Sequence, residues 1–502
     1  MLYRTPEQLD IITGAFATVF PDLFTRIKLP HASIGGLPIY AIRMRSGSPF
    51  LRRSVLITGG LHARELMNPD AIVDLMVDLC IAYQNGMDIT YGNRTWTAAT
   101  IKSLVESLDI WMIPCANPDG RQKVLDGDDL WRKNLRDNPN TSCEGVDVNR
   151  NFDIAWGIET GTTSCEPCDW NQTYCGKAAF SEPESKNIRD FCNAHRINVY
   201  VDVHSFMELV LYPWGHAPTQ VTDASQVFTT LATGTCARLD PPTYREHMRL
   251  GDLRKFQTVA QRVVDSVKAV RGRTYRAIST YALYPWAGGA TGTSSDYVYS
   301  RHIANPSLQK TYAFALETGP DTGNAEESFH PDDPASLSLI KREAKAAILT
   351  LIENSTCAIE FIGMRLATSP DIVEELRSVR DETLSTTEPG LGWIELFERI
   401  QGEVLSEILS DETLSKEAAG LLKRGGALLK SDSARLTERD VARARAFLQL
   451  LAKRLPPDVR GDIDEIQARL VSSRGQTGSQ IVTALTREAP RRRKPRKGRP
   501  AG

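Results

Sequence analysis

The chain has 502 residues, of which 41% are hydrophobic and 24% are charged. This is the composition of a globular protein, so a wholly disordered chain is excluded, and the length corresponds to about three domains of ordinary size. A net charge of −2 by itself indicates no nucleic-acid partner, and no apolar run reaches the roughly 18 residues that a membrane-spanning helix requires.

The amino terminus carries no visible targeting signal. It reads MLYRTPEQLD, which lacks the basic stretch followed by an apolar stretch that marks a secretory signal peptide. We therefore expect a cytoplasmic protein.

Short apolar runs and amphipathic stretches alternate along residues 1–365. The apolar runs are rich in β-branched and aromatic residues and predict buried strands at Ser54–Thr58, Ile110–Pro114, Val199–Val203 and Tyr312–Leu316. Helical periodicity lies between them, for example over Pro69–Tyr83 and Glu182–His195, and polar loops are predicted at 137–179 and 284–296. This alternation predicts an α/β fold in which a mixed, twisted sheet has helices on both faces.

After about residue 366 the strand signals end and helical patterns follow. Apolar residues recur at helical spacing, first at Trp393, Leu396, Phe397, Ile400, Val404 and Ile408, and again at Val441, Ala444, Leu448, Leu451 and Leu455. We expect an α/β domain over 1–365, a linker over 366–390, a small helical region over 391–472 and a flexible basic tail over 473–502.

The segment GGLHARELMN, which follows the first predicted strand directly, contains a histidine and a glutamate three residues apart. At the start of a helix, His62 and Glu65 would point to the same side, and an imidazole with a carboxylate makes half of a zinc site. His204 ends another apolar strand and is a candidate third ligand. A hydrogen-bonded structural histidine explains its position equally well.

Further motifs follow in chain order. They are NPDG at 117–120, WRKNLR at 131–136, GVDVNRNFD at 145–153, YCGKAAFSEPE at 174–184, YPWAGG at 284–289 and YAFALE at 312–317. Together with the two histidine segments, these motifs resemble the zinc metallocarboxypeptidases of the pancreatic carboxypeptidase A and B type, from about residue 35 to 320.

The resemblance implies a zinc ion held by His62, Glu65 and His204, which leaves a fourth position open as catalytic zinc sites do. It implies that Asp147 orients His62 and that Glu317 is the general base. It further implies that Arg132 stabilises the oxyanion. Substrate binding is expected from Arg64, Asn149, Arg150 and Tyr284.

These roles predict hydrolysis of the last peptide bond of peptides or proteins, because a clamp on the free carboxylate sets its distance from the metal. Ser295, the position before Asp296, is not an acidic residue that could pair a basic side chain, so we favour neutral apolar or aromatic C-terminal residues. Trp286 is a candidate for narrowing the pocket.

The alternatives to this function are action on glutamylated tails or cell-wall peptides, or a non-catalytic binding protein. The start of the chain lies close to His62, so we expect no inhibitory prodomain.

The chain has nine cysteines, four of which lie close together: Cys143, Cys165, Cys168 and Cys175. They permit two disulfides, a structural zinc bound by four thiolates, or free thiols. Relatives often close this loop with a disulfide from Cys143 to Cys165 or Cys168.

The carboxyl terminus is strongly basic. Residues 491–499, RRRKPRKGR, hold seven basic residues and no acidic one, so the rest of the chain is more acidic than the net charge suggests. This tail is expected to contact an anionic partner such as RNA, a membrane surface or an acidic protein, or to be a disordered solubilising end. Nothing in the sequence predicts an oligomeric state.

Overall fold

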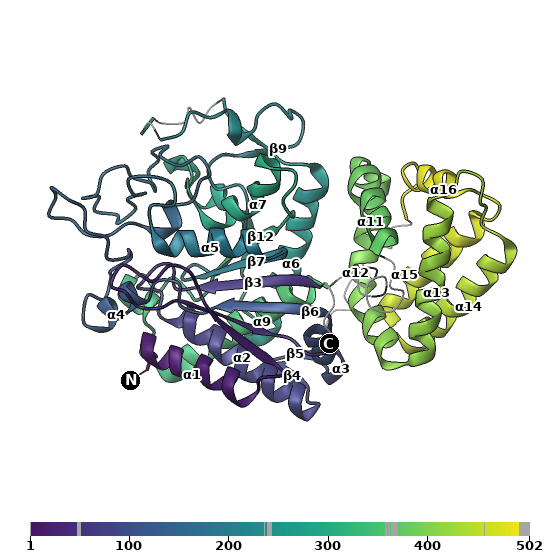
Figure 1. The fold of residues 1–502 in the computed structure, drawn as a ribbon, viewed down its shortest axis with the longest axis horizontal. Coiled ribbons are helices and arrows are strands. Elements are labelled where there is room, and N and C mark those ends of the chain that lie inside the picture. The colour runs from purple at the N-terminus through teal and green to yellow at the C-terminus, as the bar shows by residue number, and fades with distance from the viewer. Residues whose placement is uncertain are drawn as a thin grey trace, which may run out of the picture. The chain divides into compact units, whose positions relative to one another are not determined.

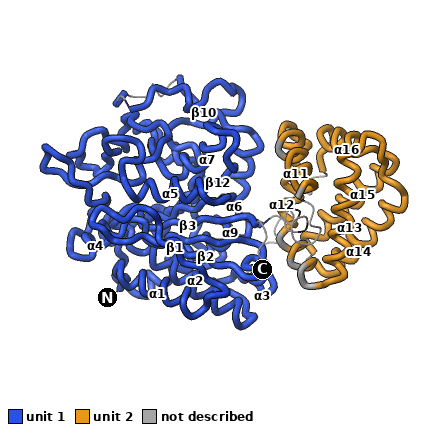
Figure 2. Tube along the Cα trace, viewed as in Figure 1, with its two compact units in different colours: residues 1–356 blue, residues 357–502 orange. Residues whose placement is uncertain are grey.

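The computed structural model describes residues 2–47, 52–234, 236–237, 243–356, 359, 362, 370–455 and 457–490. The chain divides into two compact units, residues 1–356 and residues 357–502 (Figure 2). Among the helices described, none is long and apolar enough to cross a membrane.

The first unit is built on an eight-stranded mixed sheet (Figure 1). In spatial order its strands are β1 (Phe24–Lys28), β2 (Tyr40–Met44), β6 (Leu108–Ile113), β3 (Arg53–Gly59), β7 (Ile197–His204), β12 (Tyr312–Glu317), β8 (Leu209–Tyr212) and β11 (Arg276–Ser279). Strands β6, β3, β7 and β12 are parallel neighbours, whereas β2 and β8 pair with them in the antiparallel direction. Two small sheets pair β4 (Ile89–Tyr91) with β5 (Arg94–Trp96), and β9 (Thr219–Gln220) with β10 (Glu246–His247).

Helices cover both faces of this sheet, so the predicted α/β fold is confirmed. They are α1 (Pro6–Val19), α2 (Met67–Asn85), α3 (Ala98–Ser107), α4 (Pro118–Leu125), α5 (Pro183–Ala194), α6 (Leu250–Arg271), α7 (Ser294–Ala304), α8 (Ala325–Phe329) and α9 (Pro334–Glu353). Helices α2 and α9 pack together against one face, α5 and α7 lie on the other, and α6 runs beside β8 and β11.

The central strand β7 shows why the sequence forms this arrangement. All eight of its residues are buried, because helices cover it on both sides and a buried parallel strand needs apolar side chains on both faces. The run Val199–Val203 satisfies that need. Two of the other predicted strands fall within β3 and β12, and the third, Ile110–Pro114, extends one residue past the end of β6. The parallel strands place their carboxyl ends at one edge of the sheet, where the candidate site residues gather.

The described part of the second unit is built mainly from helices, which are α11 (Pro370–Ser378), α12 (Glu388–Ser410), α13 (Glu412–Leu429), α14 (Glu438–Arg454), α15 (Pro457–Ser472) and α16 (Gly478–Leu485). Its core includes Leu396, Ile400 and Leu451, as their helical spacing predicts. Helix α11 lies in the expected linker, and α16 lies in the expected tail. The basic run 491–499 falls outside the described residues.

Candidate metal centre and substrate clamp

His62 and Glu65 lie in the loop between β3 and α2. His62 Nδ1 is 2.7 Å from Glu65 Oε1, and both side chains are buried. The expected helical placement was wrong, because α2 begins only at Met67. Pro69 accounts for this, since a proline is tolerated in the first turn of a helix but removes a hydrogen bond and clashes in its interior.

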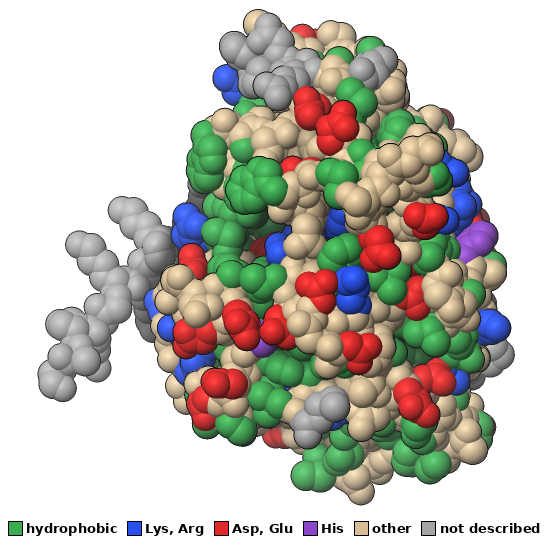
Figure 3. Space-filling view, turned by 90° about the vertical axis from the view of Figure 1, so that its left-hand side faces the viewer, with side chains coloured by type: hydrophobic (Ala, Val, Ile, Leu, Met, Phe, Trp, Pro, Cys, Tyr) green, Lys and Arg blue, Asp and Glu red, His purple; other side chains and the backbone are tan. Residues whose placement is uncertain are grey.

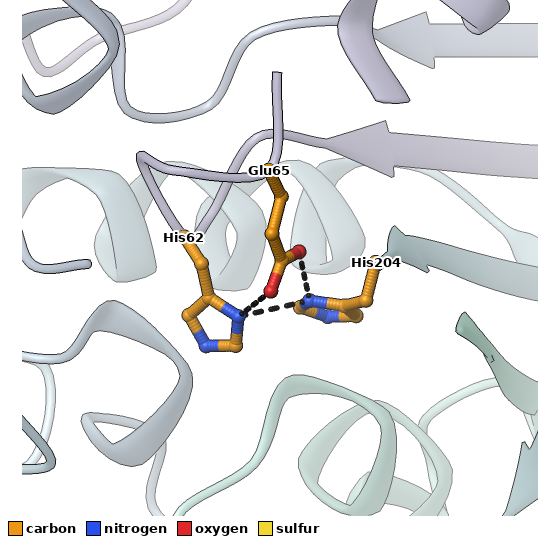
Figure 4. A group of neighbouring side chains, drawn as sticks. All are labelled: His62, Glu65 and His204. Atoms are coloured by element: carbon orange, nitrogen blue, oxygen red, sulfur yellow. Dashed lines mark hydrogen bonds and ion pairs between the residues drawn. The ribbon is translucent and has the colours of Figure 1, made fainter. Parts of the chain in front are cut away.

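His204 is the last residue of β7 and completes the group. Its Nδ1 lies 3.0 Å from Glu65 Oε2 and 3.1 Å from His62 Nδ1. Figure 4 shows the three side chains converging, two from the loop and one from the strand end. Their ligand atoms all lie within 4.8 Å of one another. The structure therefore brings together the three predicted metal ligands.

The outer nitrogens of both histidines face carboxylates. His62 Nε2 lies 3.3 Å from Asp147 Oδ1, and His204 Nε2 lies 2.9 Å from Asp202 Oδ2. A proton on each Nε2 suits these neighbours and leaves both Nδ1 lone pairs directed at the Glu65 carboxylate. Three lone-pair donors at this separation repel one another unless a cation lies between them. This donor set fits Zn²⁺, which binds imidazole nitrogen and carboxylate oxygen.

Asp147 connects the metal centre to the arginine beside it. Its Oδ2 accepts a 2.9 Å hydrogen bond from Arg132 Nε, and its Oδ1 accepts one from the backbone N–H of Asn149. Burial opposes the ionised form of Asp147, but the positive charges of Arg132 and Arg150 and the contact with His62 hold its pKa well below the ordinary value. The carboxylate is therefore an anion, and it fixes Arg132 next to the histidines.

The predicted substrate clamp lies on a short turn, Val148–Arg150, which Asp147 caps. Arg150 donates from Nε to the carbonyl oxygen of Thr162 and from Nη1 to that of Asn149, at 2.7 and 2.8 Å. Asn149 Oδ1 in turn accepts a hydrogen bond from the backbone N–H of Ser294. These contacts orient a buried guanidinium from behind without using a carboxylate.

Tyr284 and Arg64 lie close to Arg132, the arginine beside the metal centre. Burial raises the pKa of the Tyr284 hydroxyl, as does the charge of Glu317, while Arg132, Arg150 and Arg64 act in the opposite sense. These groups therefore share one electrostatic environment. Arg64 also packs over the ring of Phe329 at 4.6 Å, and burial together with Arg132 lowers its pKa to about 10.

Glu317 ends β12 and lies in register with His204 on β7. Burial and the nearby charge of Glu65 raise the pKa of its carboxyl to about 8. A carboxyl with a raised pKa can both accept and release a proton near neutral pH, and a cation beside it would lower that pKa again.

A family profile described as zinc carboxypeptidase matches residues 12–346. The chain belongs to the zinc carboxypeptidase family. It is 27% identical to mouse carboxypeptidase A4 over 323 residues, which are 64% of this chain and 63% of that protein. It is 30% identical to bovine carboxypeptidase B over 319 residues, which are 63% of this chain and 62% of that protein. The chain thus spans somewhat less than two thirds of the length of these relatives.

Solved structures of the family share the fold. The crystal structure of thrombin activatable fibrinolysis inhibitor matches with a TM-score of 0.54 at 22% identity, over 70% of this chain and 74% of that chain. The bovine form of that protein, solved with a tick carboxypeptidase inhibitor, gives a TM-score of 0.53 at 22% identity, over 70% and 97% of the two chains.

The cysteine cluster does not form a structural zinc site in this family member. Disulfides join Cys143 to Cys168 and Cys165 to Cys236, and Cys175 is a buried free thiol. The disulfide from Cys143 to Cys168 is one of the two pairings expected from relatives and is confirmed, whereas a second disulfide within the cluster is wrong, because Cys165 pairs with Cys236. The reason is that the backbone around Cys236 hydrogen-bonds to Gly157 and Glu159, which brings this distant cysteine next to Cys165.

One further expectation concerns a side chain near the clamp. Trp286 is 81% exposed, so it does not fill a pocket for the leaving residue. Among residues that the sequence did not single out, Asn68 lies 3.4 Å from Glu65 Oε2 and Asp202 contacts His204. The sequence did contain a sign of Asp202, because this acidic residue stands in a largely apolar strand and lies two positions before the predicted ligand His204.

Proposed function

We propose that this protein is a metallocarboxypeptidase that hydrolyses the C-terminal peptide bond of peptides or proteins. The proposal rests on the combination of a buried His–Glu–His group with a fixed guanidinium and with the Glu317 carboxyl, which lies in register with His204 at the same edge of the sheet. Family membership supports the same chemistry.

Zn²⁺ bound by His62, Glu65 and His204 would supply a Lewis acid for the attacking water and the scissile carbonyl. Glu317 takes a proton from that water as its oxygen bonds to the carbonyl carbon. Arg132 faces the negative charge that develops on the carbonyl oxygen. Glu317 then donates the proton to the amine nitrogen as the C–N bond breaks, which releases the last amino acid.

The clamp explains why only the last bond is cut. A planar guanidinium binds a carboxylate through two parallel hydrogen bonds, so Arg150 with Asn149 and Tyr284 fixes the free C-terminus at one distance from the metal ligands. An internal peptide bond offers no carboxylate and would leave the buried Arg150 without its anion, which is unfavourable. Arg64 extends the cationic surface toward the preceding residue of the substrate.

The surroundings of Tyr284 support a preference for neutral apolar or aromatic C-terminal residues. Tyr284 packs against a buried cluster of Leu209, Leu211, Leu283 and Ala315. Asp296, the nearest acidic residue to Ser295, accepts a 2.7 Å hydrogen bond from the backbone N–H of Gly215 and lies 3.3 Å from His216. It is therefore engaged within the fold rather than available to a basic side chain.

Substrate C-termini are the partners that we propose for the first unit. Over the face on the left of Figure 1, acidic, basic and apolar side chains are interspersed (Figure 3). An anionic partner for the basic tail remains a prediction. The cytoplasmic location is also still a prediction. The two disulfides favour a different location, because such bonds persist mainly in oxidising compartments.

The decisive experiment is a panel of N-blocked dipeptides that differ in their C-terminal residue, assayed with and without a chelator. We expect release of apolar and aromatic residues, loss of release with chelator and recovery with zinc. C-terminally amidated dipeptides should be poor substrates, and equal cleavage of amides would contradict the clamp. If zinc-loaded protein releases no residue from any dipeptide, γ-linked glutamate peptide or cell-wall peptide, the binding-protein alternative holds instead.

Glu317→Gln tests the proton step. The amide has the same shape but cannot accept the proton, so we expect kcat to fall about 100- to 10,000-fold while zinc content stays at one ion per chain. Glu327→Gln, an exposed glutamate on α8, is the matched control and should leave both quantities unchanged. Unchanged turnover in Glu317→Gln would remove Glu317 from this role.

A further inference from the structure

Strand β7 contains one charged side chain before its final histidine. Asp202 is fully buried, and because side chains alternate along a strand it points to the same face as Tyr200 and His204. A buried carboxylate is costly unless it is hydrogen-bonded and its charge is balanced. We therefore consider which groups hydrogen-bond to the Asp202 carboxylate and which charges lie near it.

Three groups contact the Asp202 carboxylate. His204 Nε2 lies 2.9 Å from Oδ2, Thr58 Oγ1 donates a 2.9 Å hydrogen bond to Oδ1, and the Ser294 hydroxyl donates to Oδ2. Asn149 Nδ2 is also 3.3 Å from His204 Nε2 and could donate only to an unprotonated ring nitrogen, but the contact with the Asp202 carboxylate is shorter, at 2.9 Å, and hydrogen bonds to an ionised acceptor are the stronger ones. The carboxylate thus favours the tautomer with the proton on Nε2.

The carboxylates behind the two histidines, Asp147 and Asp202, differ in the groups that they contact. Asp147, which faces His62, is paired with Arg132 at 2.9 Å. The contacts of Asp202 within the described structure are two neutral hydroxyls and the ring of His204. No cationic side chain contacts Asp202 within the described structure, so a divalent cation bound at the Nδ1 atoms of His62 and His204 is the positive charge that Asp202 would face through the ring of His204.

We propose that Asp202 is a positioning residue for the metal centre: it holds His204 with Nδ1 free for the metal, and its charge strengthens metal binding, as Asp147 does for His62. The proposal rests on the proposed function, since it presumes that His62, Glu65 and His204 hold zinc. Carboxylates behind metal-bound histidines typically contribute about 10- to 100-fold to metal affinity.

A purely structural role is the competing explanation, because Asp202 also ties β7 to Thr58 on β3 and to Ser294 on α7. The two roles respond differently to substitution. Asp202→Asn keeps an oxygen for the His204 proton and keeps the shape, but it removes the charge. Thr58→Val removes one tie to the neighbouring strand and leaves the charge in place.

The test measures zinc affinity of the full chain by competition with a chelator, together with the visible spectrum of the cobalt-substituted protein. Asp202→Asn should bind zinc about 10- to 100-fold more weakly and show an altered cobalt spectrum. Thr58→Val should lower the melting temperature and keep an affinity close to that of the wild type. Asp296→Asn is the matched control, since it alters a buried carboxylate beside another histidine, His216, and should not change zinc affinity.

Wild-type affinity in Asp202→Asn, or an equal loss in Thr58→Val, would overturn the proposal. If Asp202→Asn does not fold, the wild-type protein still provides a test through the imidazole ¹⁵N spectrum of its zinc form. A slowly exchanging proton on His204 Nε2 supports the proposal, and a proton on Nδ1 overturns it. Failure of the wild type to bind zinc would instead contradict the proposed function.

Discussion

His216 is predicted to make the stability of the first unit depend on pH. It is fully buried between two carboxylates, with Nε2 at 2.9 Å from Glu246 Oε2 and Nδ1 at 3.3 Å from Asp296 Oδ2. Burial disfavours the imidazolium, but hydrogen bonds and charge from Asp296 and Glu246 outweigh it and raise the pKa of His216 to about 9.

The magnitude follows from this pKa. At 1.36 kcal/mol per pH unit, a rise from the ordinary histidine value of about 6.5 to about 9 corresponds to about 3 kcal/mol. Because the folded-state pKa is raised, this stabilisation is fully present below pH 6.5. It declines as the pH increases toward 9 and is absent above it.

Urea unfolding of the wild type and of His216→Gln, followed from pH 6 to pH 9.5, measures the effect. The difference in unfolding free energy between the two proteins should shrink by about 3 kcal/mol across this range. His302→Gln is the matched control, because burial lowers the pKa of His302 to about 4 and that ring is neutral in both states above pH 7. A difference for His216→Gln that stays constant over the whole range would refute the reasoning.

Three further predictions concern the clamp and its surroundings. Arg150→Lys should raise KM for free-carboxylate dipeptides at least about 10-fold, because an ammonium cannot form two parallel hydrogen bonds, and steady-state kinetics will show whether KM changes. Gly292→Ala should destabilise the protein by about 1–3 kcal/mol and raise KM, since φ is +64° there and a Cβ would overlap the Arg150 carbonyl oxygen; an unchanged melting temperature would contradict this. Trp286→Ala should change stability by less than about 0.5 kcal/mol, and a larger loss in thermal unfolding would mean that the exposed ring packs after all.

Much of the fold could be predicted from local sequence patterns. Val199–Val203 is apolar at almost every position because both faces of β7 are covered, and that pattern is visible without the structure. His62 and Glu65 are close in the chain, so their proximity was also predictable. Their place in a loop was not predicted, although Pro69 favours a helix that begins close to it rather than at His62.

The remaining features depend on contacts between distant segments. Cys165 pairs with Cys236, 71 residues away, because two loops hydrogen-bond to each other, and spacing within the cluster gave no indication of this. Asp202 was missed for a related reason. Its charge within an apolar strand was visible in the sequence, but its contacts with Thr58 and Ser294, which come from two other elements, were not.

The position of Asp147 has a thermodynamic consequence. One carboxylate faces His62, binds Arg132 and caps the turn that carries Arg150. Loss of the metal removes positive charge from the His62 side of Asp147. The interactions by which Asp147 positions Arg132 and Arg150 on its other side therefore change as well. Metal binding and substrate binding are then linked, and linkage is reciprocal. Any factor by which zinc tightens the binding of a C-terminal carboxylate is also the factor by which that substrate carboxylate lowers the dissociation constant of zinc, so an enzyme with bound substrate should lose less zinc to a chelator at equilibrium than an empty one.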